Sequence, residues 1–277
     1  MTDAPDTFEA YAADHDDARF TDWLRERSEP DWSAAVDGRF VRELGDGTIP
    51  DPVFRRYLEQ DYAFVETLTG TFGHALGDAP SMAAKGRLAD FLGTLTSEEN
   101  DYFERSFEAL SGDHDADPDA TTRAFVDLLE RAARQGGYAE TLAVLVPAEW
   151  VYETWATGID SRPEAFYLDE WIELHANPVF VDFVAWLRAE LDREGAAVSA
   201  RRQRRLDRPF RRTANGSGRS SRRRTSARAR PTTNRRPRRA PARWPSSGSS
   251  GRAARSRRRG RTSRRPSRRA APSRRAA

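Results

Sequence analysis

The sequence predicts an all-α fold, a helical bundle followed by a disordered, arginine-rich C-terminal tail, and three observations support this. From about residue 20 to residue 193, apolar residues recur at spacings of three and four, the period of a helix with one buried side. Gly and Pro gather only between these periodic stretches. Alternation of β-branched with polar residues is scarce, so no strands are expected.

The charge of the chain changes abruptly at about residue 200. Residues 201–277 contain 30 Arg and one acidic residue, Asp207, whereas residues 1–200 contain 42 acidic and 16 basic residues, a net charge of −26. A segment whose large apolar side chains are almost limited to Phe210 and Trp244 cannot offset its chain entropy by burial. We therefore expect an acidic N-terminal extension (1–19), a helical domain (20–200) and a disordered Arg/Ser/Pro-rich tail (201–277).

Two origins of this tail stay open. Asp and Glu codons of GC-rich DNA, read one base out of register, become mainly Arg, Thr and Ser codons, so a frameshifted acidic helix would have this composition. That origin is our preferred interpretation. The alternative is a genuine polybasic arm that binds nucleic acid through phosphate charge. A nucleic-acid partner is not expected, because residues 1–200 repel phosphate and salt weakens phosphate contacts.

The acidic excess of residues 1–200, with Lys85 as the only lysine, favours a halophilic protein in a salt-rich cytoplasm, because salt screens like-charge repulsion. A merely acidic protein of an ordinary cell is the alternative. The absence of Cys excludes disulfides and thiolate metal ligands and fits a reducing cytoplasm. With a polar N-terminus and no apolar run of ~18 residues, neither a secretion signal nor a membrane span is expected.

The clearest helix is expected to begin at the cap residue Asp51, with Pro52 at its first position, and to end near Gly77. The same apolar period predicts further helices over residues 83–95, 97–110, 121–134, 138–157, 164–176 and 178–194. The loop 111–119, rich in Asp and Gly, separates two halves of the bundle. Pro147 lies within the helix 138–157, where it removes a backbone donor and bends the helix or lets it line a cavity.

Two carboxylates are expected on inner helix faces. Asp61 follows Tyr57 by four residues, so its side chain points to the apolar side of the first long helix. Glu149 follows Val146 by three residues and precedes Tyr152 by three. A buried carboxylate needs a partner, so each residue is either a site residue or a member of a structural ion pair.

His175 shares a helix face with Trp171 and Ile172, where a His is either a site residue or an ordinary core residue. The four His residues show no metal-ligand spacing. The sequence also lacks an HExxH motif, a Gly-rich phosphate loop and a GxSxG elbow. Neither a metal ion nor a nucleotide cofactor is therefore expected.

Three ordered motifs resemble the TenA family. Residues 40–50 (FVRELGDGTIP) and 54–62 (FRRYLEQDY) are similar to the family's short turn and its F..YL.QDY signature. Residues 147–152 (PAEWVY) resemble the Pro-x-x-Trp-x-Tyr motif, and residues 167–172 (YLDEWI) resemble the Tyr-x-x-x-Trp-Ile motif. The resemblance covers about residues 20–195.

This resemblance implies a heme-oxygenase-like bundle, usually a homotetramer, that hydrolyses thiamin or its breakdown pyrimidines in thiamin salvage. It implies that Asp61 binds the aminopyrimidine ring and that Phe64 contacts the substrate. Phe125 would stack on the ring in place of a common Tyr. Tyr152 matches the Tyr of the Pro-x-x-Trp-x-Tyr motif, and His175 lies where many members have a Tyr.

The sequence departs from the family at two places. Thiaminase II members carry a Cys nucleophile after the motif's Pro, and Ala148 stands here. The resemblance then implies the Cys-less branch, which hydrolyses aminopyrimidine degradation products, with Glu149 activating water. Members also close the site with a last helix that bears a catalytic Glu, but no Glu follows Glu194 and the helical pattern is lost at residues 213–216. The chain is therefore expected to lack one helix and one site carboxylate.

The leading hypothesis is an aminopyrimidine aminohydrolase, a hydrolase that binds a small aminopyrimidine. The alternative is a non-enzymatic pyrimidine-binding or regulatory protein, inactive because the last catalytic helix is missing. Heme chemistry is not expected, because His15 lies in a polar, Asp-rich stretch without an apolar face.

Overall fold

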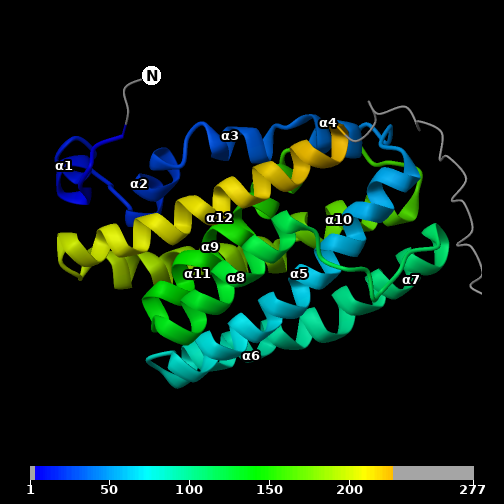
Figure 1. Ribbon diagram of the computed structural model, residues 1–277. Coiled ribbons are helices and arrows are strands. Elements are labelled where there is room, and N and C mark those ends of the chain that lie inside the picture. Colours follow the sequence, from blue (N-terminus) through cyan, green and yellow to red (C-terminus); the bar gives the residue numbers. More distant parts are fainter. Residues whose placement is uncertain (1–3, 227–277) are drawn as a thin grey trace, which may run out of the picture. The chain divides into compact units, whose positions relative to one another are not determined.

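The computed structural model describes residues 4–226, with side chains described for residues 4–216, and this part of the chain is a helical bundle without strands (Figure 1). In chain order its elements are α1 (Phe8–Ala13), α2 (Phe20–Arg27), α3 (Asp31–Val36), α4 (Arg39–Gly45), α5 (Asp51–Asp78), α6 (Met82–Thr94), the π-helix η1 (Leu95–Glu99), α7 (Asn100–Leu110), α8 (Ala120–Gln135), α9 (Tyr138–Thr157), α10 (Phe166–Ala176), α11 (Pro178–Ala196) and α12 (Ala200–Ser226). The prediction of an all-α bundle is confirmed.

The long helix α5 starts where the sequence predicts, but its cap differs. Pro50 holds the cap position, and Asp51 is the first helical residue. The Asp51 carboxylate does not cap its own helix and instead accepts a hydrogen bond from the Tyr167 hydroxyl, 2.7 Å away. Pro52 fits because a first-turn N–H has no partner within the helix.

The two helices predicted over 83–95 and 97–110 are in fact joined without a break. The five residues of η1 continue α6 directly into α7, with Leu95 buried among the core side chains. A π-helical turn is uncommon and occurs often beside functional sites. Glu99 is the last residue of η1 and directly precedes α7.

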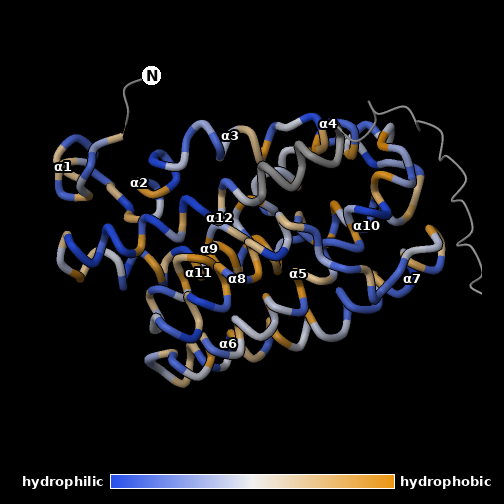
Figure 2. Tube along the Cα trace, in the orientation of Figure 1, coloured by the Kyte–Doolittle hydropathy of each residue, from blue (hydrophilic) through white to orange (hydrophobic). Residues whose placement is uncertain are grey.

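The centre of the bundle is α9, which is buried on nearly all sides and packs against α3, α5, α8, α10, α11 and α12. An unbroken run from Thr141 to Val151 is buried. A helix that is hydrophobic all round must lie in a core. Figure 2 shows hydrophobic residues gathered along α9 and a mostly hydrophilic α12. Pro147 lies inside this helix, as expected.

Residues 4–19, predicted as an acidic N-terminal extension, pack against the bundle. Tyr11 is buried, and the ring of Phe8 meets that of Phe20 edge to face at 5.4 Å. The indole N–H of Trp23 donates to the Pro5 carbonyl oxygen at 2.8 Å. The acidic composition of this segment concealed its few apolar anchors.

The domain boundary expected at residue 200 is wrong, because α12 is a packed helix of the same bundle. Leu206, Phe210 and Ala214 are fully buried, and α12 lies along α9 and α3. The Phe210 ring is nearly parallel to Trp32, with centroids 6.3 Å apart. These apolar residues at intervals of four form a stripe among the arginines, and the stripe rather than the composition decides the structure.

The expected loss of a final helix is therefore wrong for residues 200–216. Asp207, the single acidic residue after position 200, is buried and forms a two-pronged ion pair with Arg27, both distances being 3.1 Å. The rest of the predicted disordered tail, residues 227–277, lies outside the described part of the chain.

Candidate active site

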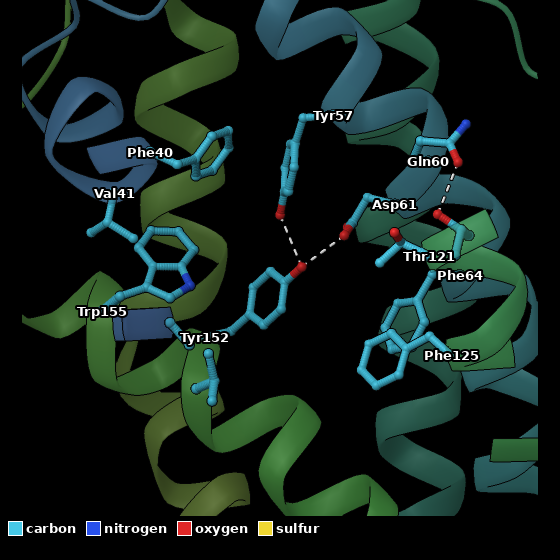
Figure 3. A pocket seen from close by; sticks show the side chains of 13 residues that line it. Phe40, Val41, Tyr57, Gln60, Asp61, Phe64, Thr121, Phe125, Tyr152 and Trp155 are labelled. Carbon is cyan, nitrogen blue, oxygen red and sulfur yellow. Dashed lines mark hydrogen bonds between the residues drawn. The ribbon is translucent and has the colours of Figure 1, made fainter. Parts of the chain in front are cut away.

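A pocket opens between α5, α8 and α9, with α3 and α4 closing one end (Figure 3). The cavity has a volume of about 40 Å³. One ordered water needs ~10–15 Å³. Its walls combine aromatic rings with a few polar groups, contributed by Ala35, Phe40, Val41, Tyr57, Gln60, Asp61, Phe64, Thr121, Thr122, Phe125, Val151, Tyr152 and Trp155. An apolar pocket with few converging polar groups is the usual form of a small-molecule site.

A chain of hydrogen bonds crosses this pocket from Tyr57 through Tyr152 to Asp61 (Figure 3). The Tyr152 hydroxyl donates to Oδ1 of Asp61 at 2.7 Å, and the hydroxyls of Tyr57 and Tyr152 lie 2.9 Å apart. Since Tyr152 has one hydroxyl proton, Tyr57 is the donor in the second bond. Burial, together with Asp61 and Tyr57, raises the pKa of Tyr152 well above its ordinary value, so Tyr152 remains a neutral donor.

Phe64 and Phe125 form the aromatic wall of the pocket. Their rings are stacked, with centroids 4.7 Å apart and planes at 10°. A third ring between them would need about 7 Å, two contacts of ~3.5 Å each. A planar ligand would therefore stack on the outside of this pair, beside Asp61.

Gln60, which the sequence patterns did not indicate as a site residue, links the start of α8 to α5. Its Oε1 atom accepts from the Asp119 N–H at 2.7 Å and from the Thr122 hydroxyl at 2.8 Å, while its Nε2 atom donates to the Asp117 carbonyl at 3.2 Å. Asp119 in turn caps α8. The position of Phe125 on α8 thus depends on Gln60. The position of Gln60 next to Asp61 in the QDY motif could have indicated that Gln60 belongs to the site.

Glu149 lies deep in the bundle, one helical turn before Tyr152 on α9, and does not line the pocket. It is 5% exposed, and its Oε1 atom has no hydrogen-bond partner among the described residues. Burial, and then the nearby carboxyls of Glu99 and Asp61, raise its pKa well above the ordinary value. The surroundings of Glu149 therefore favour its neutral, protonated form over the charged form.

Glu99 is a second carboxyl that the sequence did not single out. It is half-buried in η1, and burial together with Asp61 raises its pKa to about 8. The apolar period of the sequence did not predict that Glu99 faces inward, because the π-turn shifts every later residue around the helix axis. Asp61, on the pocket wall, thus raises the pKa of both Glu99 and Glu149, and Glu99 raises that of Glu149, so the three carboxyls lie near one another.

His175 stands behind Tyr152 rather than on the pocket wall. The two rings have centroids 4.8 Å apart, and Nδ1 lies 2.9 Å from the Trp171 carbonyl oxygen. Burial lowers the pKa of His175 to about 4, so the ring is neutral and Nδ1 carries the proton that this carbonyl accepts. The residue supports Tyr152 from behind.

Tyr57 and Trp155 also line the pocket, and neither was predicted as a site residue from the sequence. Within residues 4–226, no three His, Asp or Glu side chains are arranged to hold a metal ion. None of the helices in that range is long and apolar enough to cross a membrane.

Comparison with known proteins gives consistent matches. Residues 25–215 match the TENA/THI-4/PQQC family. The sequence is 26% identical over 197 residues to an aminopyrimidine aminohydrolase of Halalkalibacterium halodurans, covering 68% of this chain and 87% of that protein. It is 26% identical over 138 residues to the aminopyrimidine aminohydrolase of Bacillus subtilis, covering 48% of this chain and 58% of that protein.

The fold is similar to that of solved structures. A TenA homologue from Pyrococcus furiosus superposes with a TM-score of 0.68 at 19% identity, covering 73% of this chain and 98% of that one. A TenA homologue from P. horikoshii superposes with a TM-score of 0.66 at 21% identity, covering 74% and 97%. At these identities the likeness concerns the fold.

Proposed function

This chain belongs to the TENA/THI-4/PQQC family, and from that premise we propose that it is a hydrolase of thiamin-derived aminopyrimidines. The observation that carries the proposal is the hydrogen-bonded Asp61 carboxylate on the wall of a pocket whose other wall is aromatic. An aminopyrimidine is planar and presents N–H donors along one edge. The pocket offers an acceptor for that edge and a ring stack for that plane.

Asp61 holds the substrate's donor edge in this proposal. Its Oδ1 atom accepts from Tyr152, which fixes the carboxylate against rotation. A carboxylate has about four acceptor sites, so it can accept more than one hydrogen bond. Hydrogen bonds from an aminopyrimidine to a carboxylate are charge-assisted and therefore stronger than neutral ones. Stacking against Phe64 and Phe125 then orients the ring, and orientation of this kind lowers a barrier by several kcal/mol.

The reaction is a hydrolysis at the exocyclic arm. Water adds to the methylene carbon, the carbon–nitrogen bond breaks, and the nitrogen leaves as ammonia with one added proton. In this proposal Glu149, whose protonated form the surroundings favour, gives up that proton and regains one from the attacking water, so the enzyme ends unchanged. Glu99, half-buried at the end of η1, helps to raise the pKa of Glu149.

The test is calorimetric titration with an aminopyrimidine, together with an assay of ammonia release. Asp61→Asn is expected to abolish binding and to leave the helical circular dichroism unchanged, because a neutral amide cannot accept charge-assisted hydrogen bonds. Asp51→Asn is the matched control, since Asp51 lies on the same helix and accepts a tyrosine hydroxyl outside the pocket. Unchanged affinity in Asp61→Asn would remove the assignment.

A second candidate function, pyrimidine binding without turnover, is favoured by one observation. The single carboxylate after position 200, Asp207, is engaged with Arg27 and lies outside the pocket. α12 therefore brings no Glu to the site within residues 200–216. Tight binding of the aminopyrimidine with no ammonia release would support this second function over the first.

A further inference from the structure

The side chain of Gln60 is buried and joins α5 to the start of α8 through three hydrogen bonds. The Asp119 N–H can only donate and the Asp117 carbonyl can only accept, so these two bonds fix which end of the amide is the oxygen. The Thr122 hydroxyl donates the third bond, again to Oε1. Both acceptor positions of the Gln60 carbonyl oxygen are therefore filled.

These bonds hold the start of α8 from both sides. Asp117 belongs to the loop before the helix, Asp119 is the cap residue, and Thr122 lies in the first turn. The Asp119 carboxylate accepts from the N–H groups of Thr121 and Thr122, so the cap and the first turn form one unit. Among residues 120–128, Thr122 is the only buried residue. Since burial anchors this half of α8 weakly, its position depends on the hydrogen bonds to α5.

The hydrogen bonds of Gln60 lie directly beside the aromatic wall of the pocket (Figure 3). Gln60 and Phe64 are four residues apart on α5, so they share a helix face, and Thr122 and Phe125, three residues apart, share a face of α8. The bond from Thr122 to Gln60 and the stack of Phe64 on Phe125 are thus neighbouring contacts between the same two helix faces. A displacement of α8 that breaks the first contact also changes the second.

We propose that Gln60 is a positioning residue, which holds the start of α8 where Phe64 and Phe125 form one wall for a planar ring. This rests on the proposed function, because it takes a planar substrate in the pocket as given. Gln60 acts through α8 and not on the ring, since its oxygen accepts two bonds and its amide nitrogen donates to Asp117. A Glu could not replace it, because a second acceptor would face the Asp117 carbonyl and a charge would be added beside Asp61.

The experiment measures two quantities on the full chain: the affinity for an aminopyrimidine by calorimetric titration, and amide hydrogen exchange over residues 117–125 by mass spectrometry. Gln60→Leu is expected to weaken binding about tenfold or more, since one buried hydrogen bond corresponds to about that factor. Exchange over 117–125 should become faster, while exchange in α9 stays as in the wild type. Thr122→Val removes one of the three bonds and should cause a smaller loss of affinity. Thr122→Ser keeps the hydroxyl and should retain the wild-type affinity.

Thr71→Val is the matched control, because Thr71 is a buried threonine of α5 whose hydroxyl donates to the Thr67 carbonyl of its own helix, away from the pocket. It should leave both the affinity and the exchange over 117–125 unchanged. Wild-type affinity in Gln60→Leu and Thr122→Val would overturn this inference and leave the proposed function standing. Weaker binding without faster exchange would overturn it too, because Gln60 would then contact the ring itself. Failure of the wild type to bind any aminopyrimidine would overturn both the inference and the proposed function.

Discussion

At the scale of single residues, the chemistry of the site depends on which buried polar groups have hydrogen-bond partners. Asp61 has the Tyr152 hydroxyl, and Tyr152 has Tyr57. The Oε1 atom of Glu149 has no such partner among the described residues, so the group is stable in the core as a neutral acid. A neutral acid that can protonate the leaving amine is what hydrolysis of a carbon–nitrogen bond requires.

Replacing Glu149 by Gln is expected to lower kcat by roughly 10²–10⁴-fold, the usual span for loss of a proton-transferring group, with little change in substrate affinity. Single-turnover and steady-state assays of ammonia release measure this. Glu153→Gln is the control, because Glu153 lies four residues further along α9 and does not line the pocket. Near-normal turnover in Glu149→Gln would move the proton-transfer role to another group.

His175 makes the stability of the protein sensitive to acid. Its folded-state pKa is about 4, below the ordinary value of 6.5, so between these pH values the unfolded chain binds a proton that the folded chain does not. Stability from this group is complete above about pH 6.5 and is lost as pH falls towards 4, by about 2–3 kcal/mol.

The variant His175→Phe should therefore lose less stability than the wild type between pH 6.5 and pH 4, although it starts lower because the bond to the Trp171 carbonyl is gone. Urea denaturation at a series of pH values measures the slope. His74→Gln, which changes an exposed His of α5, is expected to leave that slope as in the wild type. Parallel pH profiles for wild type and His175→Phe would contradict the prediction.

At the scale of elements, α12 shows how few apolar residues a packed helix needs. The segment is dominated by arginine, yet Leu206, Phe210 and Ala214 are enough to dock it on α9 and α3. Each guanidinium can stay in water while the stripe is buried. The helix also lines a concavity together with α8.

Truncating Phe210 to Ala is expected to lower the free energy of unfolding by about 3–5 kcal/mol, because it empties a fully buried aromatic site against Trp32. Urea denaturation followed by tryptophan fluorescence measures it. Arg211→Ala is the neighbouring control and should cost less than about 1 kcal/mol, since its ion pair with Asp207 is 4.0 Å long and exposed on the Arg side. A loss below about 1 kcal/mol for Phe210→Ala would mean that α12 adds little to the core.

At the scale of the whole molecule, the acidic surface and the aromatic core act in opposite directions. The core is large, with Trp23, Trp32 and Trp171 fully or almost fully buried. The net charge of −26 over residues 1–200 repels itself and favours expansion. Ion pairs such as that of Arg19 with Asp192 relieve only part of this repulsion, because acidic residues greatly outnumber basic ones there.

The free energy of unfolding is therefore expected to rise steadily from low salt to molar KCl, as the Debye length falls from about 10 Å at 0.1 M to about 3 Å at 1 M. Thermal unfolding at a series of KCl concentrations measures it. Sucrose is the control, because it favours the compact state without screening charge. If sucrose reproduces the whole effect of KCl, charge repulsion is not the cause, and the halophilic interpretation loses its support.

The sequence by itself determined the all-α class and the position of most helices. The helix predicted over 138–157 matches α9 at both ends, and the one predicted from Asp51 begins where α5 begins. The helix predictions succeeded because helix period is a local property of the chain. Asp61, Phe64, Phe125 and Tyr152, which the family resemblance implies as site residues, line one pocket, and their roles stay predictions.

The tertiary structure alone decided which of the predicted residues line the pocket and whether the last helix is packed. The structure places Glu149 and His175 off the pocket wall and brings Gln60 and Glu99 near Asp61. It also docks a helix in a segment whose composition had predicted a disordered tail. Each of these depends on contacts between segments far apart in the chain. The apolar stripe of α12 is buried only because α9 and α3 offer it a surface, and the pKa of Glu99 rises because other helices enclose it beside Asp61.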